Sequence, residues 1–244
     1  MAVTGEFALT DEARAKLARV STATLTSQLL HRGFRNTFIA GLTTMRPDLR
    51  MVGRAFTLRY APSREDMDLN VDFDNDVNVQ RRAVEAIGPG QVLVIDARGE
   101  LRSASFGHII ATRIMKRGAA GLVTDGALRD SGEIRHLDLP SYCRGAHATT
   151  SSVMHHPVDM QVPIGCGGVL VMPGDVIVGD VEGVVVIPAA HAEEVAHAAF
   201  DQDSIEEYLT QRVASGDSIR GVYPPDERTR AEYEEWRRRR SEGA

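Results

Sequence analysis

Lysine is nearly absent from this chain of 244 residues, and cysteines and long apolar runs are scarce as well. Only Lys16 and Lys116 are lysines, so arginine carries almost all of the positive charge. Arginine suits planar carboxylates and phosphates because its donors form a rigid fork. The 28 basic residues are outnumbered by 34 acidic ones, and the net charge of -6 disfavours broad adhesion to nucleic acid or anionic membranes. We therefore expect a small-molecule ligand and no direct nucleic-acid partner.

The two cysteines, Cys143 and Cys166, are too few for a disulfide framework and too far apart for a Cys-x-x-Cys motif. The uncharged stretch Gln161 to Gly174 contains prolines and glycines and is shorter than the roughly 20 apolar residues of a membrane span. The first residues also lack the basic and apolar regions of a signal peptide. These features predict a cytoplasmic chain with no membrane partner.

The first third of the chain predicts a helix, a strand and a loop. Apolar residues recur at helical spacing from Thr10 to His31, and Gly33 can end that helix. β-type residues follow from Met51 to Tyr60. The acidic stretch from Arg64 to Asp76 is expected to be a loop.

The middle third alternates between helical and β-type patterns. A helical pattern over Val79–Ile87 precedes the apolar run Gln91–Asp96, and a second helical pattern over Gly107–Arg117 precedes the apolar run Gly121–Asp125. Helices that alternate with short apolar strands are typical of an α/β layer. The sequence therefore predicts an α/β fold for this region.

The last third is rich in β-type residues and then becomes helical. Short apolar runs lie at residues 162–164, 169–172, 176–178 and 184–187, separated by Gly, Pro and Asp. A long helix is expected over Ala189–Ala214, and Pro224 and Pro225 interrupt the pattern before an arginine-rich end. We predict one α/β domain over residues 1–225 and a charged helical tail over residues 226–244.

The segment around Gly107, together with Arg129 and Asp130, suggests a binding site. The expected helix begins at Gly107, and its first backbone N–H groups, up to that of Ile110, are free to hold an anion. Arg129 can bind a carboxylate through two parallel hydrogen bonds, and Asp130 can give one oxygen to a hard cation that keeps its waters. A 2-oxo acid could bridge these groups. The spacing fits an exposed ion pair or a turn equally well.

Two other patterns are weaker. The glycines around Cys166 lack the third glycine of a dinucleotide-binding loop, because Leu170 stands in its place. His155 and His156 are adjacent, so on a strand they face opposite ways, which favours structural or surface roles over a shared metal. Neither pattern is therefore part of the predicted site.

Several ordered motifs resemble the family of the regulator of ribonuclease activity A, which includes class II 4-hydroxy-4-methyl-2-oxoglutarate aldolases. The resemblance covers roughly residues 10 to 225. The run Asp125 to Asp130 is similar to the family's Asp-Gly-x-x-Arg-Asp motif. Further similarity lies in Val20–Gly33, Gly53–Thr57, Gly167–Gly168, Pro173–Asp180 and Gly183–Pro188.

The resemblance implies a β/β/α sandwich of the swivelling-domain type, flanked by N- and C-terminal helices and assembled as trimers or hexamers. It also implies Mg²⁺ or Mn²⁺ bound by Asp130, with Arg129 and the backbone from Gly107 through Ile109 and Ile110 holding a 2-oxo acid substrate. The implied chemistry is retro-aldol cleavage of a 4-hydroxy-2-oxo acid to pyruvate, with oxaloacetate decarboxylation as a side activity. In that chemistry the metal acts as a Lewis acid and a base removes the 4-hydroxyl proton.

One position departs from the family's catalytic pattern. The resembling aldolases carry an acidic residue after a glycine, about twenty residues before the Arg-Asp pair, where this chain has His108. A histidine can serve as a base near neutral pH, but it does not reproduce a carboxylate's charge beside a cation. We predict His108 as a catalytic residue with Arg129 and Asp130, and leave open a diverged dehydratase or decarboxylase acting on a sugar-derived acid.

The resemblance leaves two further points open. Family aldolases borrow an acidic group from a neighbouring subunit, for which Asp203, Glu206 and Glu207 are candidates outside the predicted site. Family members that inhibit ribonuclease E lack the intact Arg-Asp pair, whereas this chain has Arg129 and Asp130. This favours an enzyme over a non-catalytic, protein-binding regulator of RNA processing, which remains the alternative.

Overall fold

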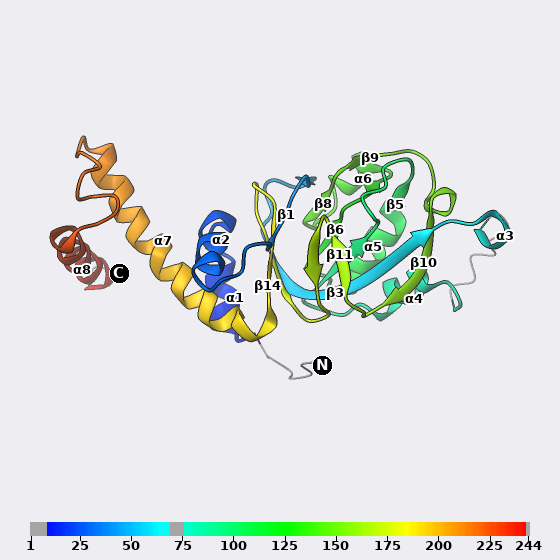
Figure 1. Cartoon of the computed structure of the whole chain (residues 1–244), viewed down its shortest axis with the longest axis horizontal. Helices are drawn as coiled ribbons and strands as arrows, with labels where there is room; N and C mark the ends of the chain where they lie inside the picture. The colour runs from blue at the N-terminus through cyan, green and yellow to red at the C-terminus, as the bar shows by residue number, and fades with distance from the viewer. Residues whose placement is uncertain (1–8, 69–75, 243–244) are drawn as a thin grey trace.

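The computed structural model describes residues 9–68 and 76–242, which form a mixed α/β fold with helices at both ends (Figure 1). Within this part of the chain the main sheet has nine strands, in the order β1-β14-β13-β3-β4-β6-β8-β2, with β10 paired to β3. These strands are β1 (Phe38–Ile39), β2 (Thr43–Thr44), β3 (Met51–Pro62), β4 (Gln91–Asp96), β6 (Gly121–Thr124), β8 (Ser141–Cys143), β10 (His155–Met160), β13 (Val176–Gly179) and β14 (Val184–Ile187).

The strands β3, β4, β6 and β8 pair in parallel, and the other pairs of this sheet are antiparallel. Two small sheets accompany it: the antiparallel pair β11 (Ile164–Cys166) and β12 (Val169–Val171), and the parallel strands β5 (Ala104–Phe106), β7 (Ala127–Leu128) and β9 (Gly145–Ala146). The predicted strands of the middle and last thirds are confirmed to within a few residues. The sequence did not indicate β1, β2, β5, β7, β8, β9 or β10.

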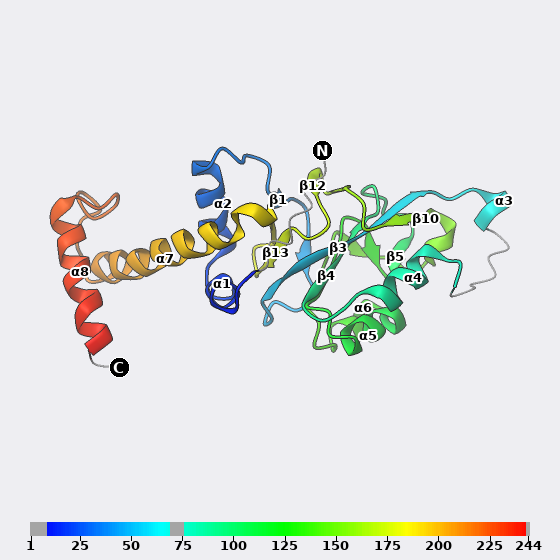
Figure 2. The ribbon, with the colours of Figure 1, turned by 90° about the horizontal axis from the view of Figure 1, so that it is seen from below.

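Helices and a hairpin cover the two faces of the main sheet. One core cluster packs α4 (Val79–Ala86), α5 (His108–Lys116) and the short α6 (Ser131–Ile134) against it, through residues such as Leu93 and Ile114. A second cluster packs β11 and β12 on the opposite side. Figure 2 shows β12 on one side of β3 and β4, with α5 and α6 on the other. The central strands are therefore apolar on both faces, as buried parallel strands require.

The chain's ends form a helical extension. A third core cluster joins α1 (Asp11–Leu17), α2 (Thr22–His31) and the start of α7 (Ala192–Ala214) to β13 and β14, and the short 3-10 turn η2 (Ala189–His191) precedes α7. The helix α7 then leaves the main body, and α8 (Glu227–Glu242) packs across its far end through Tyr208, Leu209, Val222 and Tyr233 (Figures 1 and 2). The described residues include no helix long and apolar enough to cross a membrane.

Two expectations for the N-terminal third are corrected. A single helix over Thr10–His31 is wrong, because the chain breaks after Leu17 and Ser21 begins α2 as its N-cap, with Oγ accepting from Thr24 N at 3.0 Å. The expected loop from Arg64 contains the one-turn helix α3 (Glu65–Asp68), while residues 69–75 lie outside the described ranges.

Candidate functional site

The predicted site residues follow the carboxyl ends of the small parallel sheet. The strand β5 leads into Gly107 and His108, and β7 leads into Arg129 and Asp130. The two ends are tied by a hydrogen bond from Arg129 N to Phe106 O at 3.0 Å. Residues that are 22 positions apart in the sequence thus become neighbours, at the strand edge where α/β folds usually bind ligands.

Asp130 has an unusual backbone conformation that places its carboxylate against α5. Its φ of 54° and ψ of 42° lie in the left-handed region, which is uncommon for a residue other than glycine and is concentrated at functional sites. Its Oδ2 lies 3.0 Å from His108 Nδ1, and Oδ1 lies 3.5 Å from Arg129 Nε. The pKa of Asp130 is lowered mainly by the hydrogen bond with His108, and the charge of Arg129 contributes less. The carboxylate therefore stays ionised.

The hydrogen bond also fixes the histidine's protons. An ionised carboxylate only accepts hydrogen bonds, so His108 Nδ1 must carry the donated hydrogen. In the neutral imidazole, Nε2 is then the nitrogen with a free lone pair. The side chain of His108 is 38% exposed, so Nε2 is the atom left to exchange a proton with a ligand or solvent.

Gly107 leaves room for the Arg129 and Asp130 side chains to cross the start of α5. A Cβ at this position would lie 3.0 Å from Arg129 Cγ and 3.2 Å from Asp130 Oδ2. The first main-chain bond of the helix runs from Ala111 N to Gly107 O, so the N–H groups of Ile109 and Ile110 precede the helical ladder. These N–H groups and the positive end of the helix favour an anion.

These groups share a cavity of about 260 Å³. Its lining comes from α4, β5, α5, the loop after β7, and the turn η1 (Ser151–Val153) with its preceding residue. His108 is not among the lining residues, but it is hydrogen-bonded to Asp130, which is. The lining residues are Gln80, Arg81, Ala104, Phe106, Gly107, Ile109, Ile110, Arg129, Asp130, Thr150 and Ser151.

Part of this lining was missed by the sequence analysis. Gln80 lies on the buried face of α4. The sequence hints at a special role for Gln80 only by placing a polar residue on a helix face that is otherwise apolar. Thr150 and Ser151 stand in a polar segment without a recognisable motif.

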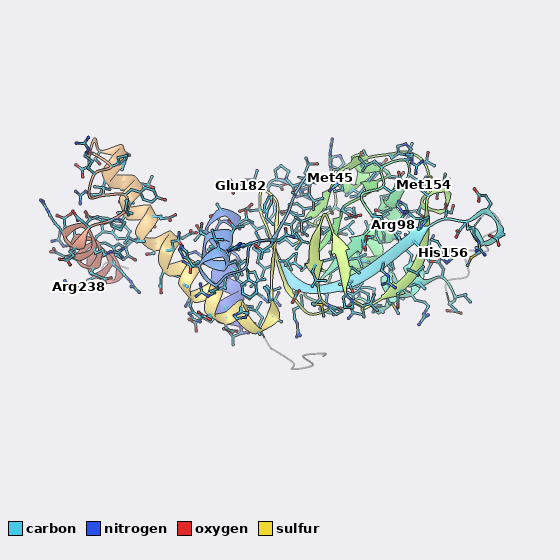
Figure 3. All side chains as sticks on the ribbon, viewed as in Figure 1. Met45, Arg98, Met154, His156, Glu182 and Arg238 are labelled. Atoms are coloured by element: carbon cyan, nitrogen blue, oxygen red, sulfur yellow. The ribbon has the colours of Figure 1, made fainter. Side chains whose placement is uncertain are left out.

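A hydrogen bond holds the end of η1 in place beside the cavity. Arg98 Nη2 donates to Met154 O at 2.8 Å, and Figure 3 labels both residues.

The first aspartate of the Asp125–Asp130 motif has a structural position outside the cavity. Asp125 is 3% exposed, and its carboxylate accepts backbone hydrogen bonds from Ala97 at 2.7 Å, Gly99 at 3.0 Å and Gly167 at 3.1 Å. Burial raises the pKa of Asp125, and these hydrogen bonds oppose that rise. Asp125 therefore joins the turns after β4 and β11 to the end of β6, which carries the site.

The donors at the cavity fit a lightly held divalent cation. Among the described residues no group of three or more His, Cys, Asp or Glu could enclose a metal, which excludes a closed zinc-type site there. Asp130 offers one partly exposed carboxylate, and Mg²⁺ typically uses one or two carboxylates and keeps several waters. The residues present thus fit Mg²⁺ or Mn²⁺ with Asp130 as the protein ligand.

The acidic candidates on α7 are not brought to this cavity within one chain. Asp203 accepts from Thr24 Oγ1 at 2.6 Å, Glu206 accepts from Gln202, and Glu207 pairs with Arg240 at 2.6 Å. They belong to the helical extension and line a separate hollow between α7 and α8.

Comparison with known proteins identifies relatives of the chain. The Aldolase/RraA family model, described as RraA-like, matches residues 18–186. A protein of Halalkalibacterium halodurans named "Putative 4-hydroxy-4-methyl-2-oxoglutarate aldolase" is 39% identical over 126 residues, which are 52% of this chain. The chain spans 60% of that protein's length. The 4-hydroxy-4-methyl-2-oxoglutarate aldolase of Thermus thermophilus is 32% identical over 139 residues, covering 57% of this chain and 76% of that protein.

A solved structure extends the likeness to most of the fold. The crystal structure of Streptomyces coelicolor RraAS2 is 33% identical, with a TM-score of 0.73, and the match covers 83% of this chain and 98% of that one. RraAS2 is described as an unusual member of the RNase ES inhibitor RraA protein family. The mixed α/β fold and the family resemblance are thereby confirmed.

Proposed function

Because the chain belongs to the RraA-like family, we propose that it is a divalent-metal-dependent carbon–carbon lyase that releases pyruvate from a 4-hydroxy-2-oxo acid. The names of the relatives from H. halodurans and T. thermophilus support this class of reaction. Oxaloacetate decarboxylation is proposed as a side activity, because it also leaves a carbanion equivalent next to a 2-oxo group.

One observation carries the proposal: Arg129, Asp130 and the free N–H groups of Ile109 and Ile110 line the same small cavity. An arginine fork and helix amides together suit the carboxylate and 2-oxo oxygens of one substrate end. The adjacent carboxylate of Asp130 suits a cation at the same end. An exposed surface ion pair would not need the left-handed backbone of Asp130 or the missing side chain at Gly107.

The residues divide the reaction among them. Arg129 binds the C1 carboxylate in two parallel hydrogen bonds, and the N–H groups of Ile109 and Ile110 orient the substrate beside it. His108 lies next to the lining residues Gly107 and Ile109 and outside the lining itself, so it acts on a substrate whose 4-hydroxyl extends past Asp130. Its Nε2 then accepts the hydroxyl proton while Nδ1–H remains on Asp130, whose charge stabilises the imidazolium. The C3–C4 bond then breaks, an aldehyde or ketone leaves, and C3 takes up a proton to give pyruvate. When bound at Asp130, Mg²⁺ or Mn²⁺ would supply a Lewis acid for the 2-oxo group.

The proposal includes the finer architecture and assembly that the resemblance implies. The layering of α4 to α6, the main sheet, and the β11–β12 hairpin supports a β/β/α sandwich of the swivelling type. The helical extension of α7 and α8 offers surface for a trimer or hexamer.

Two alternatives stay open. His108, at a position that is acidic in the resembling aldolases, is compatible with a diverged dehydratase or decarboxylase on a sugar-derived acid. The likeness to RraAS2 supports a second function, a non-catalytic regulator that binds an RNA-processing protein. The regulator predicts tight binding to a ribonuclease or helicase without metal-dependent chemistry.

The deciding experiment is pyruvate release from 4-hydroxy-2-oxo acids and oxaloacetate, with Mg²⁺, with Mn²⁺ and with a chelator. Metal-dependent pyruvate that is lost in Asp130→Asn, and kept in the control Asp138→Asn at an exposed carboxylate, is the expected result. His108→Asp tests the base: faster aldol cleavage would mean that histidine has retuned an aldolase. No pyruvate from any substrate would refute the lyase.

A further inference from the structure

The cavity that contains Arg129 has a second polar wall, made by Gln80 of α4 and by Thr150 and Ser151 at η1. None of these side chains has a part in the proposed reaction at C1 to C4. Gln80 is only 5% exposed, so its polar atoms are costly to leave without partners. Its orientation decides what this wall can bind.

Hydrogen bonds fix the amide of Gln80 in one orientation. Its Nε2 donates to Tyr60 Oη at 2.6 Å and to Ser105 O at 3.0 Å, which uses both hydrogens of the amide nitrogen. Tyr60 Oη donates its own hydrogen to Ser105 O at 2.9 Å and can therefore only accept from Gln80. A flipped amide would set its oxygen against the Ser105 carbonyl, so the nitrogen must face Tyr60 and Ser105.

This leaves Gln80 Oε1 as an acceptor without a donor. No residue that the structure describes donates a hydrogen bond to it. Burial raises the pKa of Tyr60, which keeps the phenol neutral and the amide in place. Gln80 Oε1 is not one of the fully buried side-chain atoms without a partner, so it is open to the cavity that Gln80 lines. An O–H or N–H group of a ligand can satisfy this oxygen, whereas a carboxylate is repelled by it.

We propose that this wall selects 4-hydroxy-2-oxo acids whose chain carries a further hydroxyl group beyond C4, as in acids derived from sugars. The inference rests on the proposed lyase function and names its substrate class. Arg129 and the α5 amides hold the 2-oxo acid end, Gln80 Oε1 accepts from the distal hydroxyl, and Thr150 and Ser151 donate to or accept from further hydroxyls. Arg81, the other polar residue of this wall, already interacts within the chain.

Three substrates that differ only at C5 test the inference. They are 4,5-dihydroxy-2-oxopentanoate, 4-hydroxy-2-oxopentanoate and 4-hydroxy-2-oxoglutarate, which carry a hydroxymethyl, a methyl and a carboxylate group beyond C4. In each, the C3–C4 bond breaks, the 4-hydroxyl loses its proton and C3 gains one. The products are pyruvate with glycolaldehyde, acetaldehyde or glyoxylate. We expect kcat/KM to be highest for the dihydroxy acid and lowest for the dicarboxylate.

Gln80→Leu should remove the preference. The ratio of kcat/KM for the dihydroxy acid to that for the methyl compound should fall about tenfold, as expected for one lost hydrogen bond. The matched control is Gln28→Leu, at a hydrogen-bonded glutamine of α2 outside the cavity, which should keep the ratio. If Gln80→Leu does not fold, Tyr60→Phe carries the test, because it frees one side of the Gln80 amide and should lower the same ratio.

The outcomes separate this inference from the function on which it rests. Pyruvate from none of the substrates refutes the lyase and the inference together. If the wild type prefers the dicarboxylate, Arg81 binds the distal group and the inference is overturned while the lyase stands. If Gln80→Leu lowers kcat/KM equally for all three substrates and leaves the ratios unchanged, the inference is also overturned, and Gln80 is a structural residue.

Discussion

Replacing His155 by phenylalanine should make the folded chain less sensitive to acid. His155 begins β10, is 1% exposed, and has no hydrogen-bond partner for either ring nitrogen among the described residues. Its ring centroid lies 5.1 Å from that of Tyr60. Burial is the main cause that lowers the pKa of His155 from 6.5 to about 4, and the charge of Arg98 adds to it.

The direction and size of the effect follow from proton linkage. Below pH 6.5 the unfolded chain protonates this histidine, whereas the folded chain keeps it neutral until about pH 4. The unfolded state therefore binds more protons in this window, and stability falls as the pH is lowered through it. At 1.36 kcal/mol per pKa unit, this histidine lowers the free energy of unfolding by about 2 kcal/mol between pH 7 and pH 5, and by about 3 kcal/mol between pH 7 and pH 4.

The assay is urea unfolding at pH 7 and pH 5, at one fixed protein concentration because assembly would change apparent stability. Between the two pH values, the free energy of unfolding of His155→Phe should fall by about 2 kcal/mol less than that of the wild type. The variant keeps the ring contact with Tyr60 and leaves no polar atom unpaired. His136→Phe, at an exposed histidine, shows what the loss of any histidine does. An equal acid loss in wild type and His155→Phe would refute the reasoning.

Three further substitutions test the site and the sheet. Arg129→Lys should raise KM for 2-oxo acids about tenfold or more in steady-state kinetics, because a point charge replaces a bidentate fork; an unchanged KM would place the carboxylate elsewhere. Gly107→Ala should lower kcat/KM with little change in thermal unfolding, since its Cβ crowds flexible side chains, whereas Gly132→Ala, with nothing within 4 Å, should be silent. Gly53→Ala should lower the free energy of unfolding in urea by about 1–3 kcal/mol, because its Cβ would lie 2.7 Å from the Gly90 carbonyl oxygen. A variant as stable as the wild type would contradict this packing.

The regular elements of the α/β core could be predicted because their local patterns agree with their final surroundings. The apolar run Gln91–Asp96 is a strand in the sequence pattern and in the structure, since helices and a hairpin bury both of its faces. The break between α1 and α2 was missed because apolar spacing continues across it. Only the capping bond of Ser21 decides where the second helix begins.

The small parallel sheet could not be predicted from its own residues. Its strands β5, β7 and β9 contain two or three residues each, too few for any periodicity, and they pair only because the larger sheet brings their loops together. Arg129 and Asp130 were found through a motif and through their chemistry. Gln80, Thr150 and Ser151 belong to no motif, so only the fold reveals that they share the cavity.

Two aspartates of one motif show how the site differs from its scaffold. A left-handed backbone alone does not mark the site, because Arg98 and Gln161 also have positive φ. Asp125 and Asp130 stand in one motif, yet the first satisfies its buried carboxylate with three backbone N–H groups of neighbouring turns, whereas the second holds a left-handed backbone and faces a cavity. A carboxylate with all its partners inside the protein stabilises a turn. A carboxylate that is partly exposed beside a histidine, an arginine and free helix amides has capacity left for a ligand. The same criterion identifies Gln80, whose nitrogen is fully bonded and whose oxygen is not.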